Sequence, residues 1–545
     1  MTGPVHVPRP PSERAAGEGH PVRVRIPAEE TAGDGQPVRV RVPAEGAAGD
    51  GQPVRVRIPV EEAAGEGQSV RVRFPVEGAV GVGDLVRDVT GGPGLSVGDD
   101  RVREFLVAVG RGLLRPAVAR RHPELASLGF FLRPRELERA VGPASGEHVR
   151  VPRGLVFHVP PANVDTVFVY SWALSALMGN RNVVRLSARA GVVAEVILGV
   201  LHEALDVADP VVARTQRVVT YDRPGRESEG SRPLREGESS RPLRESEGSR
   251  PLREGESSRP LRESEGSRPL RESEGGRPLR EDEDGRSLRE SEGRAPDPTA
   301  ELSAACDLRV IWGGDRTVDE IRRHPLAPHA RDLAFPDRSS FAVVRAAAWL
   351  AAEPATRAAV ADGFATDAYW FDQAACSSPG TVFWVGSPGE CEAARDGFTA
   401  CLAQAVARRG WTVDAAMAVE KRVATYGLAA DGVASSVEFR GNALAQVVLT
   451  APDRAPRRWL GTGTFAHARL GTLGELAGVV RRKDQTMTHF GFGREELAEL
   501  AGALGGRGVD RMVPVGAALG FHRVWDGVDL PAEFTRLVTV TASPS

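Results

Sequence analysis

Runs of consecutive apolar residues alternate with amphipathic segments along the first half of the non-repetitive chain. This pattern predicts strands at 154–160, 182–187, 217–221 and 307–312, separated by helices at 164–178, 190–207 and 317–323. Continuous apolar strands are typical of a parallel sheet that is covered by helices on both faces. The succession of strand, helix and strand therefore predicts a doubly wound α/β sheet.

A second alternating block follows. The pattern predicts strands at 340–344, 381–385, 465–470 and 512–515, and helices at 354–368, 390–408, 473–480 and 495–504. We expect a second α/β unit from this block, and hence two medium-sized domains in the non-repetitive chain.

Two tandem repeats lengthen the chain. Val-Arg-Val-Arg, followed by an apolar residue and Pro, recurs with a period of 16, starting at Val22, Val38, Val54 and Val70. We interpret 70–74 as a genuine strand that pairs with a sheet edge and the three earlier copies as duplications. An Arg-rich arm for nucleic acid is the alternative, but the Glu and Asp residues between the copies cancel its charge.

The second repeat has a period of 9 and occupies residues 223–298. It contains 17 Arg, 19 acidic residues and no aromatic residue, so it cannot bury enough apolar surface to fold. We predict a disordered insert in a strand-to-helix connection. A tether that docks a partner protein is the alternative.

These boundaries predict four parts of the chain. Residues 1–68 form a repetitive extension, 69–330 a cofactor-binding domain interrupted by the insert, and 331–480 a catalytic domain. Residues 481–545 form a C-terminal segment that packs back on the core.

Composition excludes several classes of protein. The formal net charge is −3, and only Lys421 and Lys483 are lysines, so the arginines indicate coding bias and we expect no nucleic-acid partner. No apolar run reaches the length of a membrane span, and the N-terminus lacks a signal peptide. The four cysteines form no CxxC pair, so we expect neither a disulfide framework nor a metal site. These features predict a cytoplasmic protein.

Three positions have candidate chemistry. Gly313-Gly314 follows a strand and precedes a helix, where backbone N–H groups bind phosphate, although from the pattern alone a simple capped turn is the better interpretation. Cys376 lies in a turn before a strand, where free N–H groups would lower the pKa of its thiol, although a lone cysteine is more often an inert buried residue. Asn163 follows a strand, and its alternative role is that of a helix cap. We expect Cys306, Cys391 and Cys401 to be inert.

Taken together, the chain resembles the LuxC-type fatty acyl-CoA reductases, a branch of the aldehyde dehydrogenase superfamily. The resemblance covers about residues 70–222 and 299–541. The segments that carry it are, in chain order, His158-Val-Pro-Pro-Ala-Asn163, Gly179-Asn-Arg-Asn-Val-Val-Arg-Leu-Ser187, Val310-Ile-Trp-Gly-Gly-Asp315, Phe335-Pro-Asp-Arg-Ser-Ser340, Phe371-Asp-Gln-Ala-Ala-Cys-Ser-Ser-Pro379, Gln485-Thr486, Val509-Asp-Arg-Met-Val-Pro-Val-Gly516 and Trp525-Asp-Gly527.

The resemblance implies a function and assigns roles to residues. It implies NADPH-dependent reduction of a fatty acyl thioester to the aldehyde, with Cys376 as the acylated nucleophile and Asn163 as the oxyanion amide. It implies that Gly313 and Gly314 form the turn at the cofactor pyrophosphate. Arg185 takes the place of a lysine that contacts the adenosine ribose, on the strand that ends at Ser187.

The resemblance also implies the partners. It implies acyl-CoA or an acyl-carrier thioester as substrate and an acyl-protein synthetase as partner protein. We also expect a homo-oligomer. The segment 333–340 lacks the glutamate with which aldehyde-oxidising relatives activate water, in agreement with reduction. His489 is a candidate proton donor, although a structural histidine is the better interpretation. Two alternatives stay open, a reductase of carrier-bound chains and a non-catalytic protein that interacts through its repeats.

Overall fold

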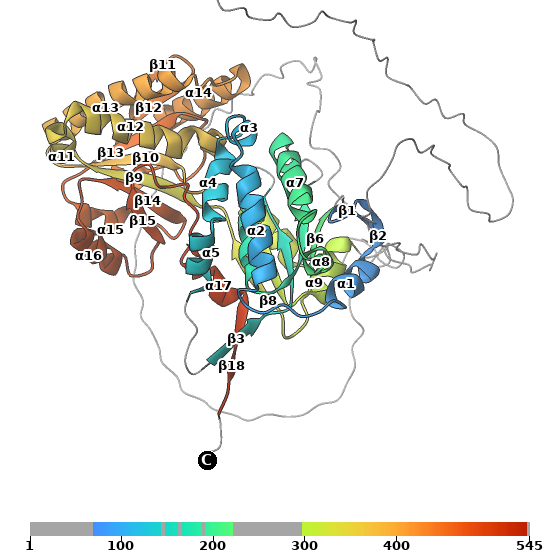
Figure 1. The fold of residues 1–545 in the computed structure, drawn as a ribbon. Helices are drawn as coiled ribbons and strands as arrows, with labels where there is room; N and C mark the ends of the chain where they lie inside the picture. The colour runs from blue at the N-terminus through green and yellow to red at the C-terminus, as the bar shows by residue number, and fades with distance from the viewer. Residues whose placement is uncertain (1–68, 143–147, 162–165, 188–190, 222–296, 542–545) are drawn as a thin grey trace, which may run out of the picture. The chain divides into compact units, whose positions relative to one another are not determined.

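The computed structural model describes residues 69–142, 148–161, 166–187, 191–221 and 297–541. Most strands in these residues belong to two seven-stranded sheets (Figure 1). The three earlier copies of the period-16 repeat lie outside the described residues, and so does the period-9 repeat up to residue 296. The last two residues of the segment predicted to be disordered, Asp297 and Pro298, are ordered instead, because Pro298 begins a helix that Asp297 caps.

The first sheet has the strand order β2-β1-β6-β5-β4-β7-β8, and β6 through β8 are parallel. Its strands are β1 Ser69–Phe74, β2 Gly78–Gly81, β4 Leu155–Val159, β5 Arg181–Leu186, β6 Gln216–Thr220, β7 Leu308–Trp312 and β8 Arg331–Phe335. The chain starts the parallel part in the middle, at β4, and adds strands first on one side and then on the other. This order confirms the predicted doubly wound sheet and creates a switch point between β4 and β7.

Helices cover both faces of this sheet because alternate side chains of each strand point to opposite faces. Val156, Val184 and Val310 pack on α2, α4, α6 and α7, whereas Phe157 and Ile311 pack on α1, α9 and α10. The helices of this half are α1 Val82–Thr90, α2 Asp100–Leu113, α3 Pro116–Ala119, α4 Glu124–Phe131, α5 Pro134–Val141, α6 Thr166–Leu177, α7 Val192–Leu205, α8 Pro210–Thr215, α9 Pro298–Ala305 and α10 Asp315–Arg322.

The fourth copy of the period-16 repeat forms strand β1, as predicted. It pairs antiparallel with β6 at the border of the parallel strands and with β2 on its other side. Val70 and Val72 point into the core, while Arg73 on the opposite face pairs with Glu77 and Glu195. The alternating pattern therefore places one apolar row inside and one charged row outside.

The second sheet has the order β11-β12-β13-β10-β9-β14-β15, in which only β11 is antiparallel. Its strands are β9 Ser339–Arg345, β10 Pro379–Val385, β11 Ala434–Arg440, β12 Leu444–Leu449, β13 Thr464–Leu470, β14 Asp484–Phe490 and β15 Arg511–Pro514. Trp349, Phe364 and Phe398 cover one face from α11 Ala346–Ala351, α12 Pro354–Tyr369 and α13 Pro388–Arg409 (Figure 1).

The other face of the second sheet packs on α15 Leu476–Val479 and α16 Arg494–Leu504, through Leu476 and Leu500. Leu428 of α14 Ala415–Ala430 joins the same cluster. The remaining short elements are the 3-10 turns η1 Trp370–Gln373, η2 Pro452–Arg454 and η3 Leu473–Glu475, the strands β16 Val524–Trp525 and β17 Val528–Asp529, and the helix α17 Leu530–Glu533.

A short connection joins the two sheets. Strand β8 ends at Phe335, and β9 begins at Ser339 after residues 336–338 alone. The carboxyl end of a strand in the first sheet thus leads directly into the amino end of a strand in the second. Because β8 pairs with β7, the first sheet extends past the domain boundary that the sequence analysis places at residue 330.

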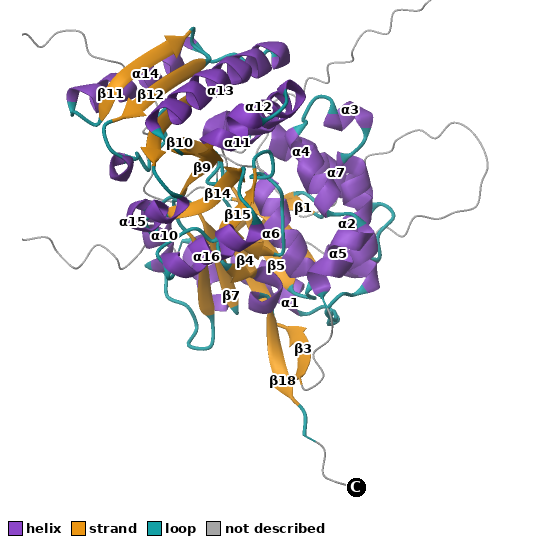
Figure 2. Ribbon diagram, turned by 90° about the vertical axis from the view of Figure 1, so that its left-hand side faces the viewer, coloured by secondary structure: helices purple, strands orange, loops and turns teal. Residues whose placement is uncertain are grey.

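A separate two-stranded ribbon is formed by β3 His148–Pro152 and β18 Thr535–Thr539, which pair antiparallel. It protrudes from the rest of the described chain in both views (Figures 1 and 2). Val149, Leu537 and Val538 are exposed on it. Among the described residues, no helix has the length and apolar character needed to cross a membrane.

Candidate active site

Cys376 lies between α12 and β10, at the amino edge of the second sheet. Two neighbouring strands hold its backbone. The Ser340 hydroxyl at the start of β9 donates to the Cys376 carbonyl at 2.6 Å, and this hydroxyl accepts from the Thr486 N–H of β14 at 3.1 Å. The predicted turn before a strand is therefore present, and it is tied to two strands that are distant in sequence.

The backbone in front of Cys376 is left-handed. Phe371, Asp372 and Gln373 have φ angles of 55°, 51° and 58°. None of the three is glycine, so each residue in this conformation costs about 1–2 kcal/mol. A run of this kind persists only where surrounding contacts hold it, and such runs are concentrated at functional sites.

The side chain of Gln373 supplies those contacts. Its amide nitrogen donates to the carbonyls of Pro379 and Thr464 at 2.9 and 3.0 Å. Its amide oxygen accepts from the N–H groups of Gly463 and Thr464 at 2.8 and 3.2 Å. The buried amide thus makes four backbone hydrogen bonds and connects the turn to the starts of β10 and β13.

The thiol of Cys376 contacts an amide that is itself held by a carboxylate. Gln485 Nε2 lies 3.4 Å from Cys376 Sγ, and the same nitrogen donates to Asp526 Oδ1. Burial, together with the charge of Asp526, raises the pKa of the Cys376 thiol to about 12. This corrects the expectation of a lowered thiol pKa, because segments distant in sequence enclose the sulfur. The resting thiol is protonated at neutral pH.

Arg338 lies between two carboxylates next to this thiol. It pairs with Asp510, and its guanidinium lies 3.8 Å from Asp526 Oδ2. Burial raises the pKa of Asp526 to about 6 in spite of these partners. A cavity of about 100 Å³ lies against this cluster, and Cys376, Ser340 and Arg338 line part of its wall.

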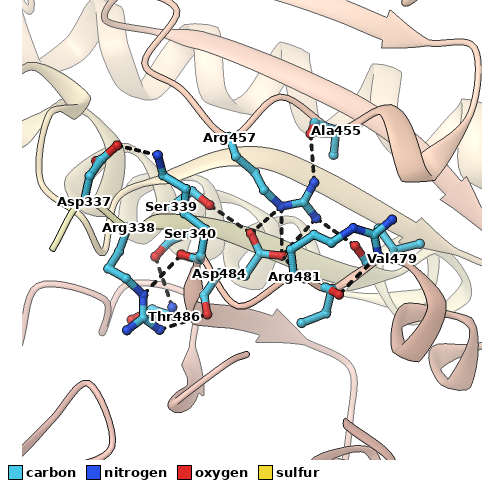
Figure 3. Close-up of polar contacts among 12 residues, drawn as sticks. Asp337, Arg338, Ser339, Ser340, Ala455, Arg457, Val479, Arg481, Asp484 and Thr486 are labelled. Carbon is cyan, nitrogen blue, oxygen red and sulfur yellow. Dashed lines mark hydrogen bonds and ion pairs between the residues drawn. The ribbon is translucent and has the colours of Figure 1, made fainter. Parts of the chain in front are cut away.

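A buried carboxylate fixes the adjacent strand ends (Figure 3). Asp484, the first residue of β14, accepts from Ser339 Oγ at 2.8 Å and from the Arg481 N–H at 2.8 Å. Arg457 donates to both of its oxygens, Nε to Oδ1 and Nη2 to Oδ2, at 2.9 Å each. The starts of β9 and β14 are therefore locked to each other one residue away from the groups that contact Cys376.

The four residues predicted for the cofactor lie at the carboxyl edge of the first sheet, on both sides of β4. Arg185 and Ser187 lie at the end of β5, and Gly313 and Gly314 follow β7. The Arg185 guanidinium lies 5.0 Å from the ring centre of Tyr221, and its Nε is buried without a hydrogen-bond partner in the described chain. This group is suited to an anionic ligand.

The two glycines have different roles. The Gly313 N–H already donates to the Phe335 carbonyl at 3.2 Å, and a Cβ at this position would lie 3.1 Å from Thr317. Gly314 caps α10 and has open space beside it. Gly313 therefore allows the close approach of helix and strand, whereas the first turn of α10 retains N–H groups without intrahelical partners.

The other candidates are placed as follows. Asn163 lies outside the described residues. His489 lies on β14 four residues beyond Gln485, about 13 Å along the strand, which separates it from the thiol. Burial raises the pKa of Cys306 to about 12 and also raises the pKa of Cys391. No group of His, Cys, Asp and Glu suited to a metal ion occurs among the described residues.

Sequence reasoning from spacing alone missed Gln485 and Asp526 as site residues. They lie 109 and 150 positions from Cys376 in sequence, so only the fold brings them to the sulfur. The available signal was their place in two of the segments that carry the family resemblance.

Comparison with known proteins supports the predicted family. The model of the family described as "Acyl-CoA reductase (LuxC)" matches residues 135–229 and 297–426, which confirms the predicted resemblance and supports an enzyme of the acyl-CoA reductase type. No curated protein sequence matches the chain.

Solved structures share the fold. An oxidoreductase from Marinobacter aquaeolei has a TM-score of 0.52 at 10% identity, over 87% of this chain and 94% of that one. Methylmalonate-semialdehyde dehydrogenase from Oceanimonas doudoroffii has a TM-score of 0.51 at 13% identity, over 85% and 91%. NAD-dependent benzaldehyde dehydrogenase from Corynebacterium glutamicum has a TM-score of 0.50 at 12% identity, over 85% and 89%. They confirm the predicted aldehyde-dehydrogenase-like fold.

Replacement of Gln373 tests the support of the left-handed turn. We expect Gln373→Ala to lower the free energy of unfolding in urea by about 2–4 kcal/mol, since it removes four hydrogen bonds to buried backbone groups. Gln446→Ala is the matched control, because Gln446 is equally buried but its amide makes no hydrogen bond within the described chain. Equal losses in the two variants would contradict the role assigned to Gln373.

Proposed function

We propose that this chain reduces a long-chain fatty acyl thioester to the aldehyde through an acyl-cysteine at Cys376, with NADPH as reductant. The main support is the contact between the Gln485 amide N–H and the Cys376 sulfur, together with the match of the chain to the acyl-CoA reductase family model.

The first step is acyl transfer to the thiol. Cys376 loses its proton, its sulfur forms a bond to the carbonyl carbon, and the carbonyl oxygen becomes an oxyanion. Collapse of this intermediate breaks the bond to the departing thiol, which leaves with the proton. We assign the stabilisation of this oxyanion to Gln485, whose amide nitrogen lies at the sulfur, and, on the family resemblance, to the Asn163 amide.

The second step reduces the acyl-cysteine. A bound reduced nicotinamide would supply a hydride, which is the chemistry that the chain's own residues lack. The carbon–sulfur bond of the thiohemiacetal on Cys376 then breaks, the aldehyde leaves, and the Cys376 thiolate takes up a proton from solvent. The segment 333–340 contains no glutamate that could activate water against the acyl-enzyme, and its one carboxylate, Asp337, pairs with Lys483. The missing glutamate favours reduction over hydrolysis.

Asp526 positions the Gln485 amide. An ionised carboxylate accepts from Gln485 Nε2, so the nitrogen faces the sulfur and the amide oxygen faces away. A protonated Asp526 can donate to the amide oxygen instead, and this exchange turns the nitrogen away from Cys376. The protonation state of Asp526 therefore controls a donor at the reacting sulfur.

The carboxyl edge of the first sheet fits a phosphorylated dinucleotide. The buried Arg185 Nε without a partner is suited to a 2′-phosphate on the adenosine ribose, and Ser187 ends the same strand. Gly314 and the first turn of α10 would meet the pyrophosphate, and Gly313 lets that helix approach the sheet.

The proposed partners follow from the same family match. An acyl-protein synthetase would supply the acyl group, and a carrier-bound thioester is the alternative to CoA. A second copy of the chain would cover the apolar residues of the β3–β18 ribbon, Val149, Leu537 and Val538. Sedimentation equilibrium at micromolar concentration tests the homo-oligomer, and a purely monomeric protein would exclude it.

The central test combines product and intermediate. With NADPH and acyl-CoAs of several chain lengths, the full-length protein should form trapped aldehyde, and without NADPH labelled acyl-CoA should acylate Cys376. Cys376→Ala should lower turnover by about a thousandfold or more. Cys401→Ala, at another partly buried cysteine, should retain both activities. Acylation of a different residue, or undiminished turnover in Cys376→Ala, would refute the proposal.

Replacement of Arg185 tests the choice of cofactor. We expect the wild type to prefer NADPH. In Arg185→Ala, the ratio of kcat/KM for NADPH to kcat/KM for NADH should fall about tenfold, because a charge-assisted contact to phosphate is removed. Arg181→Ala at the opposite end of β5 is the control and should keep the ratio. Equal use of both cofactors by the wild type would overturn the assignment.

Replacement of Asp526 tests the positioning of the amide. Since the pKa of Asp526 is raised to about 6, kcat/KM should fall as the pH drops through 6, and this inflection should vanish in Asp526→Asn. Asp319→Asn, at an exposed carboxylate of α10, should keep the wild-type profile. An inflection near pH 6 that persists in Asp526→Asn would assign it to another group.

A further inference from the structure

A cavity of about 660 Å³ lies between α4, α5 and the loop Gly520–Arg523. Its volume is in the range of sites for small organic ligands. Phe130, Phe131 and Phe521 contribute aromatic surface, and the Phe130 side chain is 47% exposed. An exposed aromatic ring in a concave site is suited to stacking with a planar base.

Arginines surround this aromatic surface. Arg133, Arg135, Arg139 and Arg523 all line the cavity, against one acidic residue, Glu136. Arg139 pairs with Glu136 and Arg523 with Asp529. No ion pair of Arg133 or Arg135 occurs within the described residues, and the Arg133 guanidinium lies 4.3 Å from the centre of the Phe130 ring. The cavity therefore carries an excess of positive charge next to an aromatic face.

The cavity is linked to the reactive thiol through a single loop. His522 lines it and also lines a second cavity of about 250 Å³, whose wall includes Gln485 and Asp526. Gln485 is the residue whose amide contacts Cys376 Sγ. Phe521 of the first cavity and Trp525 of the second pack on each other, with ring centres 6.0 Å apart. The arginine-lined cavity and the cavity next to Gln485 therefore share His522 as a wall residue.

We infer that this cavity binds the 3′-phosphorylated ADP end of a coenzyme A thioester, so that the pantetheine arm passes His522 and brings the acyl carbonyl to Cys376. The inference rests on the proposed function and selects CoA as the acyl donor. Arg133 and Arg135 bind the phosphates, and Phe130 stacks with the adenine. None of Arg185, Ser187, Gly313 and Gly314 lines the cavity, which separates it from the cofactor edge.

The test compares two thioesters of one acyl group, CoA and N-acetylcysteamine, with the full-length protein and NADPH. The double variant Arg133→Ala/Arg135→Ala should raise KM for acyl-CoA about tenfold, with kcat unchanged, and should leave KM for acyl-N-acetylcysteamine unchanged. Arg120→Ala/Arg121→Ala is the matched control, because these exposed arginines precede α4 outside the cavity.

A second readout does not depend on turnover. Calorimetry should show that the wild type binds adenosine 3′,5′-bisphosphate and that the cavity variant binds it about tenfold more weakly, with an unchanged melting temperature. If the wild type reduces no thioester but this binding difference holds, the proposed function fails and the site stands.

Other outcomes would overturn the site while the reductase function stands. Three results for the double variant would each exclude CoA binding in this cavity. They are an unchanged KM for acyl-CoA, an equal increase of KM for both thioesters, and an increase of KM for NADPH in place of acyl-CoA. A rise confined to an acyl-carrier-protein thioester would assign the arginines to a protein partner.

Discussion

The buried Asp484 carboxylate is the contact on which the geometry around Cys376 depends. It joins Ser339, Arg457 and the backbone of Arg481, which belong to three separate segments. Adjacent residues of a strand point to opposite sides. With Ser339 and Asp484 locked together on one side, the next residues, Ser340 and Gln485, are directed to the Cys376 carbonyl and sulfur on the other. Loss of the carboxylate would remove the ion pair of the partly buried Arg457 and the hydrogen bonds that join the starts of β9 and β14.

The thiol is held from a second direction by the Gln373 amide. Its four hydrogen bonds maintain a backbone that three non-glycine residues would otherwise leave. Asp372 adds to this support, because its carbonyl accepts from Trp459 Nε1 and Thr462 Oγ1 at 2.9 and 3.0 Å. Under the proposed function, the Cys376 thiol is therefore fixed before an acyl group binds, and no ordering of the turn is needed.

The architecture could be predicted from the sequence because its central strands are continuous apolar runs. The predicted strands at 307–312 and 381–385 agree closely with β7 and β10. Strand β11 was missed because it is an exposed edge strand in which polar and charged residues predominate, and helices α2 to α5 lie in a segment for which no elements were predicted.

The surroundings of Cys376 could not be predicted from the sequence for another reason. Burial and the charge of Asp526 raise the pKa of its thiol, and both depend on how the second sheet and the loop after β15 pack.

The residues on either side of 222–296 are held together by the folded chain itself. Tyr221 Oη at the end of β6 lies 3.2 Å from Thr299 Oγ1 in the first turn of α9. With the flanking residues fixed at this separation, the closure of a loop between them costs only about 0.6 kcal/mol more for each doubling of the loop length. Gain or loss of whole repeat units by replication slippage would therefore be nearly neutral for the sheet, and the same position would accept an inserted reporter domain.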